Sequence, residues 1–350
     1  MKITRAIDRL LAVGLGLLST YAVFCLVVFA YGEAPRAVVA ELAAGTWGST
    51  YGIGQVLFKA TPLLFAGVAV DVGLRAKLFN VGAEGQIAVA SLAVAVVGTM
   101  LPAGCPRILA WTISIVVASG CGAAWAAPPA FLRAKRGVHE VLTTVLMNRI
   151  ADTLLSLALA SGLALAGTTR TRDVADAVKI PRLDVLANGF QGSSASFAIL
   201  LALATAAVAS FAFRRTRVRE LWLVGENPTA AAAAKIPVPS RIAQALLLSG
   251  AIAGLASTAT VLGYKGYFEL GLGAGAGFGG LAVAMIGRGS VVGLVLASLF
   301  FGTLEQGGLV VNAHVPREVM SVLAGVAIVL VALAERTLLR PRDAEAEVAQ

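Results

Sequence analysis

The sequence predicts an all-α fold: a polytopic membrane helical bundle of about ten transmembrane helices. Three observations support this fold class. The chain of 350 residues is 58% hydrophobic and only 13% charged, whereas soluble domains carry about a quarter charged residues. Its mean hydropathy is +0.85. Apolar runs of about 20 residues, the length that an α-helix needs to cross hydrocarbon, recur along most of the chain.

The apolar runs place the expected helices in order. The stretch from Leu10 to Phe29 has spanning length and lacks a clear small-residue cleavage site, so we expect a retained first helix. The later runs follow the same criterion, apart from one shorter helix near the glycine-rich region. We expect helices near residues 10–31, 56–74, 84–102, 108–131, 141–166, 196–213, 241–263, 278–287, 290–311 and 318–338.

Lysine and arginine residues indicate the orientation of the bundle, because cytoplasmic loops of membrane proteins carry an excess of them. If the N-terminus is cytoplasmic, most of the basic residues fall in clusters on the cytoplasmic side, and half of the external ones lie in the single long loop 167–195, where this rule is weak. These clusters are Lys2, Arg5 and Arg9; Arg75 and Lys77; Arg133, Lys135 and Arg136; the segment from Arg214 to Arg241; Arg288; and Arg336, Arg340 and Arg342. We therefore expect a multi-pass protein with both termini in the cytoplasm.

The net charge of +9 does not indicate nucleic-acid binding. The basic residues lie in short clusters at the ends of apolar runs instead of forming a stripe with interleaved aromatic residues, so membrane lipid is the expected surrounding. The three cysteines, His139 and His314 show no metal-ligand spacing. We expect neither a metal site nor a disulfide framework.

A polar octet, Phe79 to Gln86, interrupts the apolar runs. Unpaired polar groups are costly in hydrocarbon, so such a cluster survives only where protein or a water-filled cavity surrounds it. One reading is that Asn80, Glu84 and Gln86 border a passage for a polar solute. The other is that Asn80 and Glu84 cap the third spanning helix, where a carboxylate is favourable beside the helix dipole.

A second polar stripe enters the membrane after His139. A helix that begins there carries Glu140, Thr144 and Asn148 on one face, which suits either the wall of an aqueous passage or hydrogen bonds between helices. Arg149 is unusual at this depth, but Asp152 lies three residues further on and can pair with it. His139 itself is read as a residue of the membrane interface.

The longest cytoplasmic segment, 214–240, reads as turn, short helix, turn. Asn227 can cap a short helix with Pro228 at its first position, which leaves residues 229–235 as about two turns beneath the membrane. Such a helix can dock into another protein, or it can simply connect two spans.

Glycine patterns carry further expectations. Gly275, Gly277 and Gly280 match a nucleotide-binding spacing, but no strand precedes them, so residues 263–287 fit irregular backbone that lines a cavity and leads into a short helix. The pairs Gly250/Gly254 and Gly289/Gly293 have the spacing that lets helix backbones approach closely, although glycine is also simply common in membrane helices. The nucleotide-binding Walker A and His-Glu-x-x-His zinc patterns are absent from the sequence.

Five ordered segments together resemble one family. They are the octet, residues 137–148, 224–228, 249–254 and 277–287. This chain is similar, over roughly residues 55–335, to the ABC-importer permease family that includes nucleoside, simple-sugar, ribose-type and branched-chain amino-acid permeases. The octet is most similar to the nucleoside branch. His139 departs from the more usual asparagine, and Arg149 departs from an uncharged residue.

The resemblance implies one transmembrane permease domain over 1–350, with an N-terminal helix and external segment at 1–55, a permease core at 56–338 and a cytoplasmic tail at 339–350. It implies a bacterial cytoplasmic (inner) membrane and no enzyme activity or cofactor in this chain, since partner subunits use the ATP. The implied partners are a cytosolic ABC ATPase, a second permease subunit that is a paralogue, and an external substrate-binding lipoprotein.

On this basis we expect a permease subunit that carries nucleosides, with simple sugars as the alternative. The expected passage-lining residues are Asn80, Glu84, Gln86, Glu140, Asn148 and Phe278, of which Phe278 offers a face for stacking. The resemblance assigns ATPase coupling to segment 214–240, with Gly225, Glu226, Asn227, Pro228, Ala231 and Ile236.

Two rival classes are an ion-coupled secondary transporter and an intramembrane enzyme. The first usually places ionisable groups deep in its bundle, and few lie deep in this sequence. The second needs a nucleophile with a base, or metal ligands, at membrane depth, and no such pairing is evident.

Overall fold

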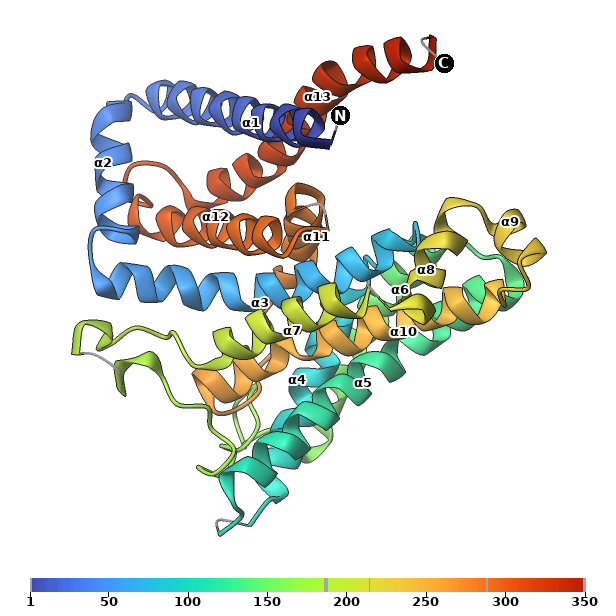
Figure 1. Cartoon of the computed structure of the whole chain (residues 1–350). Coiled ribbons are helices and arrows are strands. Elements are labelled where there is room, and N and C mark those ends of the chain that lie inside the picture. The colour runs from blue at the N-terminus through green and yellow to red at the C-terminus, as the bar shows by residue number, and fades with distance from the viewer. Residues whose placement is uncertain (1, 103, 186–187, 214, 288, 349–350) are drawn as a thin grey trace. The chain divides into compact units, whose positions relative to one another are not determined.

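The computed structural model describes residues 2–102, 104–185, 188–213, 215–287 and 289–348 (Figure 1). Arg214 and Arg288, two of the basic residues that indicate a cytoplasmic location for their segments, lie outside the described residues. The α-helices are α1 Lys2–Ala30, α2 Pro35–Thr46, α3 Thr50–Arg75, α4 Ala83–Met100, α5 Arg107–Arg136, α6 Glu140–Ala158, α7 Ala198–Ala212, α8 Thr216–Glu226, α9 Pro228–Ala233, α10 Val238–Gly254, α11 Ala276–Gly287, α12 Val291–Val310 and α13 Arg317–Val348.

Four shorter helical turns complete the structure. Two are π-helical extensions, η1 Leu159–Leu163 after α6 and η4 Thr258–Lys265 after α10, and two are single 3₁₀ turns, η2 Leu183–Val185 and η3 Asn188–Phe190. Strand-like pairing in the described ranges is limited to isolated bridges such as Ala164 with Thr171. The all-α prediction is confirmed.

Each of the ten expected apolar helices has a counterpart, but they differ in length. Among the described residues, eight helices are long and apolar enough to cross a membrane, whereas α7 and α11 are shorter apolar helices. The chain is therefore a multi-pass helical membrane protein. The sequence reading missed α2 and α8, because α2 is neither long nor uniformly apolar and α8 carries charged residues.

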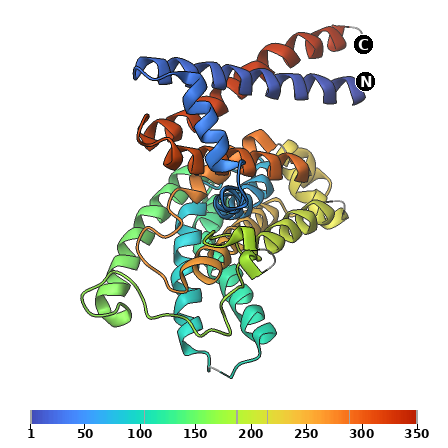
Figure 2. The same cartoon turned by 90° about the vertical axis from the view of Figure 1, so that its left-hand side faces the viewer.

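The chain divides into two compact units, a terminal unit of residues 1–56 with 303–350 and a central unit of residues 57–302. In the terminal unit α1 and α13 run side by side (Figures 1 and 2). They approach closely because Gly16 has no side chain; a Cβ there would lie 2.6 Å from the Val331 backbone. Its core contains Phe24, Val28, Val38, Val311, Val315, Met320 and Leu323.

In the central unit α5 and α10 pack along much of their length (Figure 1). Gly122 of α5 faces Gly250 and Gly254 of α10, and a Cβ on any of the three would overlap the opposing helix. The expected close contact at Gly250/Gly254 is therefore confirmed. Gly289 and Gly293 do not share a helix, because Gly289 lies before α12 with a φ of +71°; Gly293 alone packs closely, and a Cβ there would overlap the Gly287 carbonyl oxygen.

The helix α4 lies among its neighbours α5, α6, α10 and α11. A tight turn joins α3 to α4, and residues 266–275 connect η4 to α11 by irregular backbone in which four glycines have positive φ: Gly266, Gly271, Gly273 and Gly275. This agrees with the expected irregular segment. The turn before α4 and this glycine-rich loop both meet the start of α4, where the candidate site lies.

Candidate solute site and coupling segment

The side chains of Asn80 and Gln86 form a closed amide pair. Asn80 Nδ2 donates to Gln86 Oε1 at 2.8 Å, and Gln86 Nε2 donates to Asn80 Oδ1 at 3.1 Å. Asn80 Nδ2 also donates to Ser249 Oγ of α10 at 2.8 Å, and that hydroxyl donates to the Ala69 carbonyl of α3. Asn80 is 0% and Gln86 1% exposed, so this network ties α3, α4 and α10 together inside the subunit.

The start of α4 differs from the capping interpretation. The helix begins at Ala83 with Gly82 as its N-cap residue, and no side chain caps it. Asn80 lies two residues earlier, where its Oδ1 accepts the Gly82 N–H at 3.1 Å, as in an Asx turn. The prediction that Asn80 caps the helix is therefore wrong, because α4 begins two residues later than an N-cap at Asn80 requires.

Glu84, in the first turn of α4, holds the glycine-rich loop. Its Oε1 accepts the Gly275 N–H at 2.6 Å, and its Oε2 accepts the Gly277 N–H at 2.8 Å. Gly277 has to be glycine, because a Cβ there would overlap the Glu84 backbone. Each carboxylate oxygen keeps lone pairs beyond these two bonds, so the half-buried carboxylate can accept further donors.

The stripe Glu140, Thr144 and Asn148 lies on one face of α6, as expected, and that face is buried. Asn148 accepts the Gly85 N–H at 2.9 Å and donates to the Val81 carbonyl at 3.0 Å. Glu140 accepts the Phe79 N–H at 3.2 Å and forms an ion pair with Arg133, Nε to Oε2, at 3.2 Å. This face of α6 therefore clamps the turn that leads into α4.

A different face of α6 is polar and exposed, and of this face the sequence analysis had identified only the pair Arg149 and Asp152. Arg149, Asp152, Thr153 and Ser156 share it at helical spacing. The side chains of Arg149 and Asp152 are 83% and 66% exposed and lie 3.8 Å apart. The exposed apolar residues Leu146, Ile150, Leu154 and Leu157 lie on the adjacent side. Periodic spacing of 149, 152, 153 and 156 is the signal that could have revealed this face.

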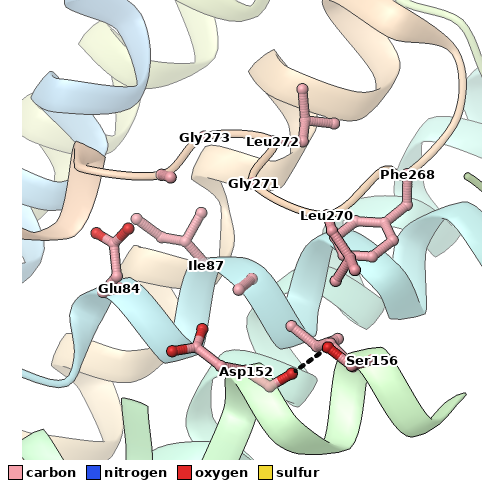
Figure 3. Close-up of a pocket in the computed structure, with 12 residues that line it drawn as sticks. Glu84, Ile87, Asp152, Ser156, Phe268, Leu270, Gly271, Leu272 and Gly273 are labelled. Atoms are coloured by element: carbon pink, nitrogen blue, oxygen red, sulfur yellow. Dashed lines mark hydrogen bonds between the residues drawn. The ribbon is translucent and has the colours of Figure 1, made fainter. Parts of the chain in front are cut away.

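A cavity of about 240 Å³ lies between α4, the polar face of α6 and the glycine-rich loop (Figure 3). Glu84, Asp152 and Ser156 supply its polar side chains, and Ser156 Oγ donates to the Asp152 carbonyl at 2.8 Å. The remaining walls are Ile87, Ala88, Leu155, Phe268, Leu270, Gly271, Leu272, Gly273 and Ala274. Two carboxylates and a hydroxyl over apolar walls suit a neutral solute with hydrogen-bond donors.

The structure places the six expected passage residues differently: four are buried inside the subunit, and Glu84 and Phe278 are accessible at its surface. Asn80, Gln86, Glu140 and Asn148 are buried, and their side chains bond to other parts of the same subunit. Glu84 lines the cavity. Phe278, 53% exposed, follows Gly277 at the start of α11 and is not part of the cavity wall.

The segment 214–240 folds as two helices. Asn227 caps α9, its Oδ1 accepting the Ala230 N–H at 2.9 Å, and Pro228 occupies the first turn, which confirms the expected cap and short helix. Glu226 pairs with Lys77 at 3.1 Å. Gly225 packs so closely on Ala76 that a Cβ would lie 2.6 Å from the Ala76 carbonyl carbon. The segment is therefore seated on the turn between α3 and α4.

Most of the residues assigned to ATPase coupling stabilise the conformation of this segment. Ala231 is buried, and the Ile236 N–H bonds to its carbonyl at 3.0 Å. An ion pair between Arg241 and Glu220, with its shortest distance 2.6 Å, joins α10 to α8. The large exposed apolar side chains among the described residues of the segment are Trp222 and Leu223, which are 46% and 43% exposed. An aromatic residue exposed on a charged helix is the signal that the sequence reading passed over.

Comparison with known proteins adds independent findings. The family model described as "Branched-chain amino acid transport system / permease component" matches residues 52–332. A guanosine ABC transporter permease of Bacillus subtilis (strain 168) is 31% identical over 95% of this chain and 94% of its own length. A glucose ABC transporter permease of Haloferax volcanii is 32% identical over 83% of this chain and 78% of its own.

A nucleoside ABC transporter permease of Lactococcus lactis is 25% identical over 88% of this chain and 86% of its own. No solved structure is significantly similar to the chain. The helical membrane fold and the match over most of the sequence lead to one conclusion: the chain belongs to the permease family of ABC transport systems described as the branched-chain amino acid permease component.

Proposed function

We propose that this permease conducts nucleosides into a bacterial cell across the cytoplasmic (inner) membrane, driven by ATP hydrolysis in separate cytosolic subunits. The observation that carries the proposal is the exposed charged face of α6, because charged side chains in a spanning helix require water or protein around them. This face opens on the cavity that Glu84 lines. A guanosine and a nucleoside permease among the relatives support the solute class.

The chemistry of the cavity supports a neutral solute rich in donors. The carboxylates of Glu84 and Asp152 accept hydrogen bonds from ribose hydroxyl groups and base N–H groups. The same carboxylates repel a phosphate, so a nucleoside is favoured over a nucleotide. A simple sugar offers the same hydroxyl groups, and the glucose permease among the relatives makes it the alternative.

The proposal includes the partners. The polar face of α6 borders a water-filled interface with a second permease subunit, which is a paralogue of this chain. The adjacent apolar residues Leu146, Ile150 and Leu154 face lipid. An external lipoprotein delivers the solute. Both termini lie in the cytoplasm, as the distribution of basic residues predicts.

Within this passage the six expected residues take different parts. Glu84 contacts the solute directly, and Phe278 offers its exposed ring for stacking at the seam. Asn80, Gln86, Glu140 and Asn148 hold the turn and α4 in position from behind. The division of roles makes different predictions for the two groups, since loss of a solute contact leaves the fold intact.

Uptake measurements on the complete transporter in vesicles test the passage. Asp152→Asn should lower the initial rate of guanosine uptake about tenfold at limiting solute, because a hydrogen bond to a charged acceptor contributes about 1.5 to 3 kcal/mol. The matched control is Asp176→Asn, a carboxylate in the loop before α7 that pairs with Lys179 at 2.7 Å. Its uptake should equal that of the unaltered protein.

Three results would contradict the proposal. One is unchanged uptake in Asp152→Asn. Another is competition by guanosine monophosphate as strong as that by guanosine, since the carboxylates would then not exclude phosphate. A third is uptake that follows an ion gradient without ATP hydrolysis, which would support a secondary transporter. Uptake of glucose in preference to guanosine would establish the sugar alternative.

We also propose that α8 and α9 couple the permease to its ATPase. Trp222 and Leu223 form the contact surface, while Gly225, Glu226, Asn227, Pro228, Ala231 and Ile236 keep it in shape. Trp222→Ser should reduce co-purification of the ATPase and leave the thermal unfolding midpoint of the permease unchanged. Val185→Ser, at an apolar site outside the segment that is 75% exposed, is the control. Full ATPase recovery with Trp222→Ser would remove the proposed contact.

A further inference from the structure

A groove of about 440 Å³ lies between the end of α5 and the start of α10, away from the cavity described above. Both helices belong to membrane-spanning segments. The walls of the groove are small or apolar at its centre and polar at one end. Its lining residues are Ala127, Ala130, Phe131, Ala134, Lys135, Pro239, Ser240, Ala243 and Leu247.

The groove is shaped by side-chain size. Ala130 and Ala243 leave space where the two helices meet, while Phe131, 58% exposed, stands at the outer wall. An apolar hollow open to the side of two spanning helices faces the acyl chains of the bilayer. Filling it with hydrocarbon removes packing voids along both helices.

The polar end of the groove is basic. Lys135 lines it, and Arg136 follows in the last turn of α5; within the described part of the chain neither pairs with a carboxylate. The nearby acidic groups are already engaged, Glu140 with Arg133 and Glu220 with Arg241. An unpaired ammonium beside an apolar groove at the end of a spanning helix attracts the headgroup of an anionic lipid.

We propose that this groove is a binding site for one anionic phospholipid. An acyl chain occupies the space above Ala130 and Ala243, and the headgroup phosphate accepts hydrogen bonds from Lys135 Nζ and the Ser240 hydroxyl. The opposite charges of lysine and phosphate select this occupant over zwitterionic lipid. The site adjoins the coupling segment, since Ala130 shares a buried cluster with Leu221 of α8.

The test compares two adjacent cations. The complete transporter is placed in nanodiscs that contain phosphatidylglycerol and phosphatidylcholine, and the phosphatidylglycerol that remains bound after detergent extraction is counted by native mass spectrometry. Lys135→Gln should lower its binding about fivefold. Arg136→Gln, which removes the same charge from the next residue, should lower it far less because Arg136 does not line the groove.

A second variant tests the groove itself. Ala243→Phe fills the hollow without altering charge, and it should lower phosphatidylglycerol retention as strongly as Lys135→Gln. Equal losses in Lys135→Gln and Arg136→Gln would overturn the proposal in favour of diffuse electrostatic attraction. Unchanged retention in both Lys135→Gln and Ala243→Phe would also overturn it.

Discussion

Asn80 and Gln86 hydrogen bond to each other through both of their side-chain amides, although six positions separate them and a turn and the start of α4 lie between. The pair is shielded from solvent and reaches α10 through Ser249. It explains how polar residues persist in an apolar bundle: Asn80 uses both of its donors and both of its acceptor positions within the subunit, and Gln86 uses one of each.

The first prediction concerns this pair. Asn80→Ala should destabilise the permease by about 1 to 3 kcal/mol, because the Gln86 amide and the Gly82 N–H lose their buried partner. Thermal unfolding of the purified protein measures the loss. In a double-mutant cycle with Gln86→Ala, the two effects should be non-additive. Strict additivity would mean that the pair contributes no coupling.

The close contact of α5 and α10 gives the second prediction. Gly122→Ala should destabilise the protein by about 1 to 3 kcal/mol, since the new methyl group meets the backbone of Gly250 and Gly254. Gly120→Ala is the matched control on the same helix, where a Cβ meets nothing within 4 Å. Its unfolding midpoint should stay the same or rise slightly. Similar unfolding midpoints for Gly122→Ala and Gly120→Ala would show that α5 and α10 can move apart without loss of stability.

The third prediction concerns the N-cap of α9. Asn227→Ala removes the acceptor for the Ala230 N–H and should destabilise the short helix by about 1 kcal/mol. Hydrogen exchange in residues 228–233 should become faster, and solute-stimulated ATP hydrolysis by the complete transporter should fall. Asn227→Asp retains a capping acceptor and should restore both properties. Loss of ATP hydrolysis in both variants would point to a direct contact by the amide instead.

The fourth prediction is a pH dependence in the terminal unit. His314 lies 3.0 Å from both Glu33 and Glu41 through its two ring nitrogens, and both nitrogens can donate only when the ring is protonated. The hydrogen bond to Glu33 and the charges of both carboxylates raise the pKa of His314. The stabilisation is therefore complete below the unfolded-state pKa of about 6.5 and is lost as pH rises through the higher folded-state pKa.

Thermal unfolding across this pH range should show a midpoint that falls as pH increases, and His314→Gln should remove that part of the dependence. The chain has one other histidine, His139, which caps α6 by accepting the Val141 N–H. His139→Asn keeps a capping acceptor and should leave the dependence unchanged. A pH profile that survives in His314→Gln would assign the effect to other groups.

Much of this protein follows from local sequence. The length of the apolar runs determined the membrane fold and the order of the helices, since crossing hydrocarbon requires about 20 apolar residues whatever the neighbours are. Asn227 with Pro228 determined the start of α9, because a cap and a fixed φ act within one turn. Gly250 and Gly254 indicated a close helix contact, although their partner Gly122 could not be known.

Only the tertiary structure decided which polar residues are sealed and which are open. Asn80, Gln86 and Asn148 have the same chemistry as residues of a solute passage, but their partners come from positions distant in the chain, such as Ser249 and Gly85. Exposure of Asp152 depends on how α4, α6 and the glycine-rich loop meet. A residue type sets which hydrogen bonds a side chain can form, whereas the packing of helices sets whether protein or solute supplies the partner.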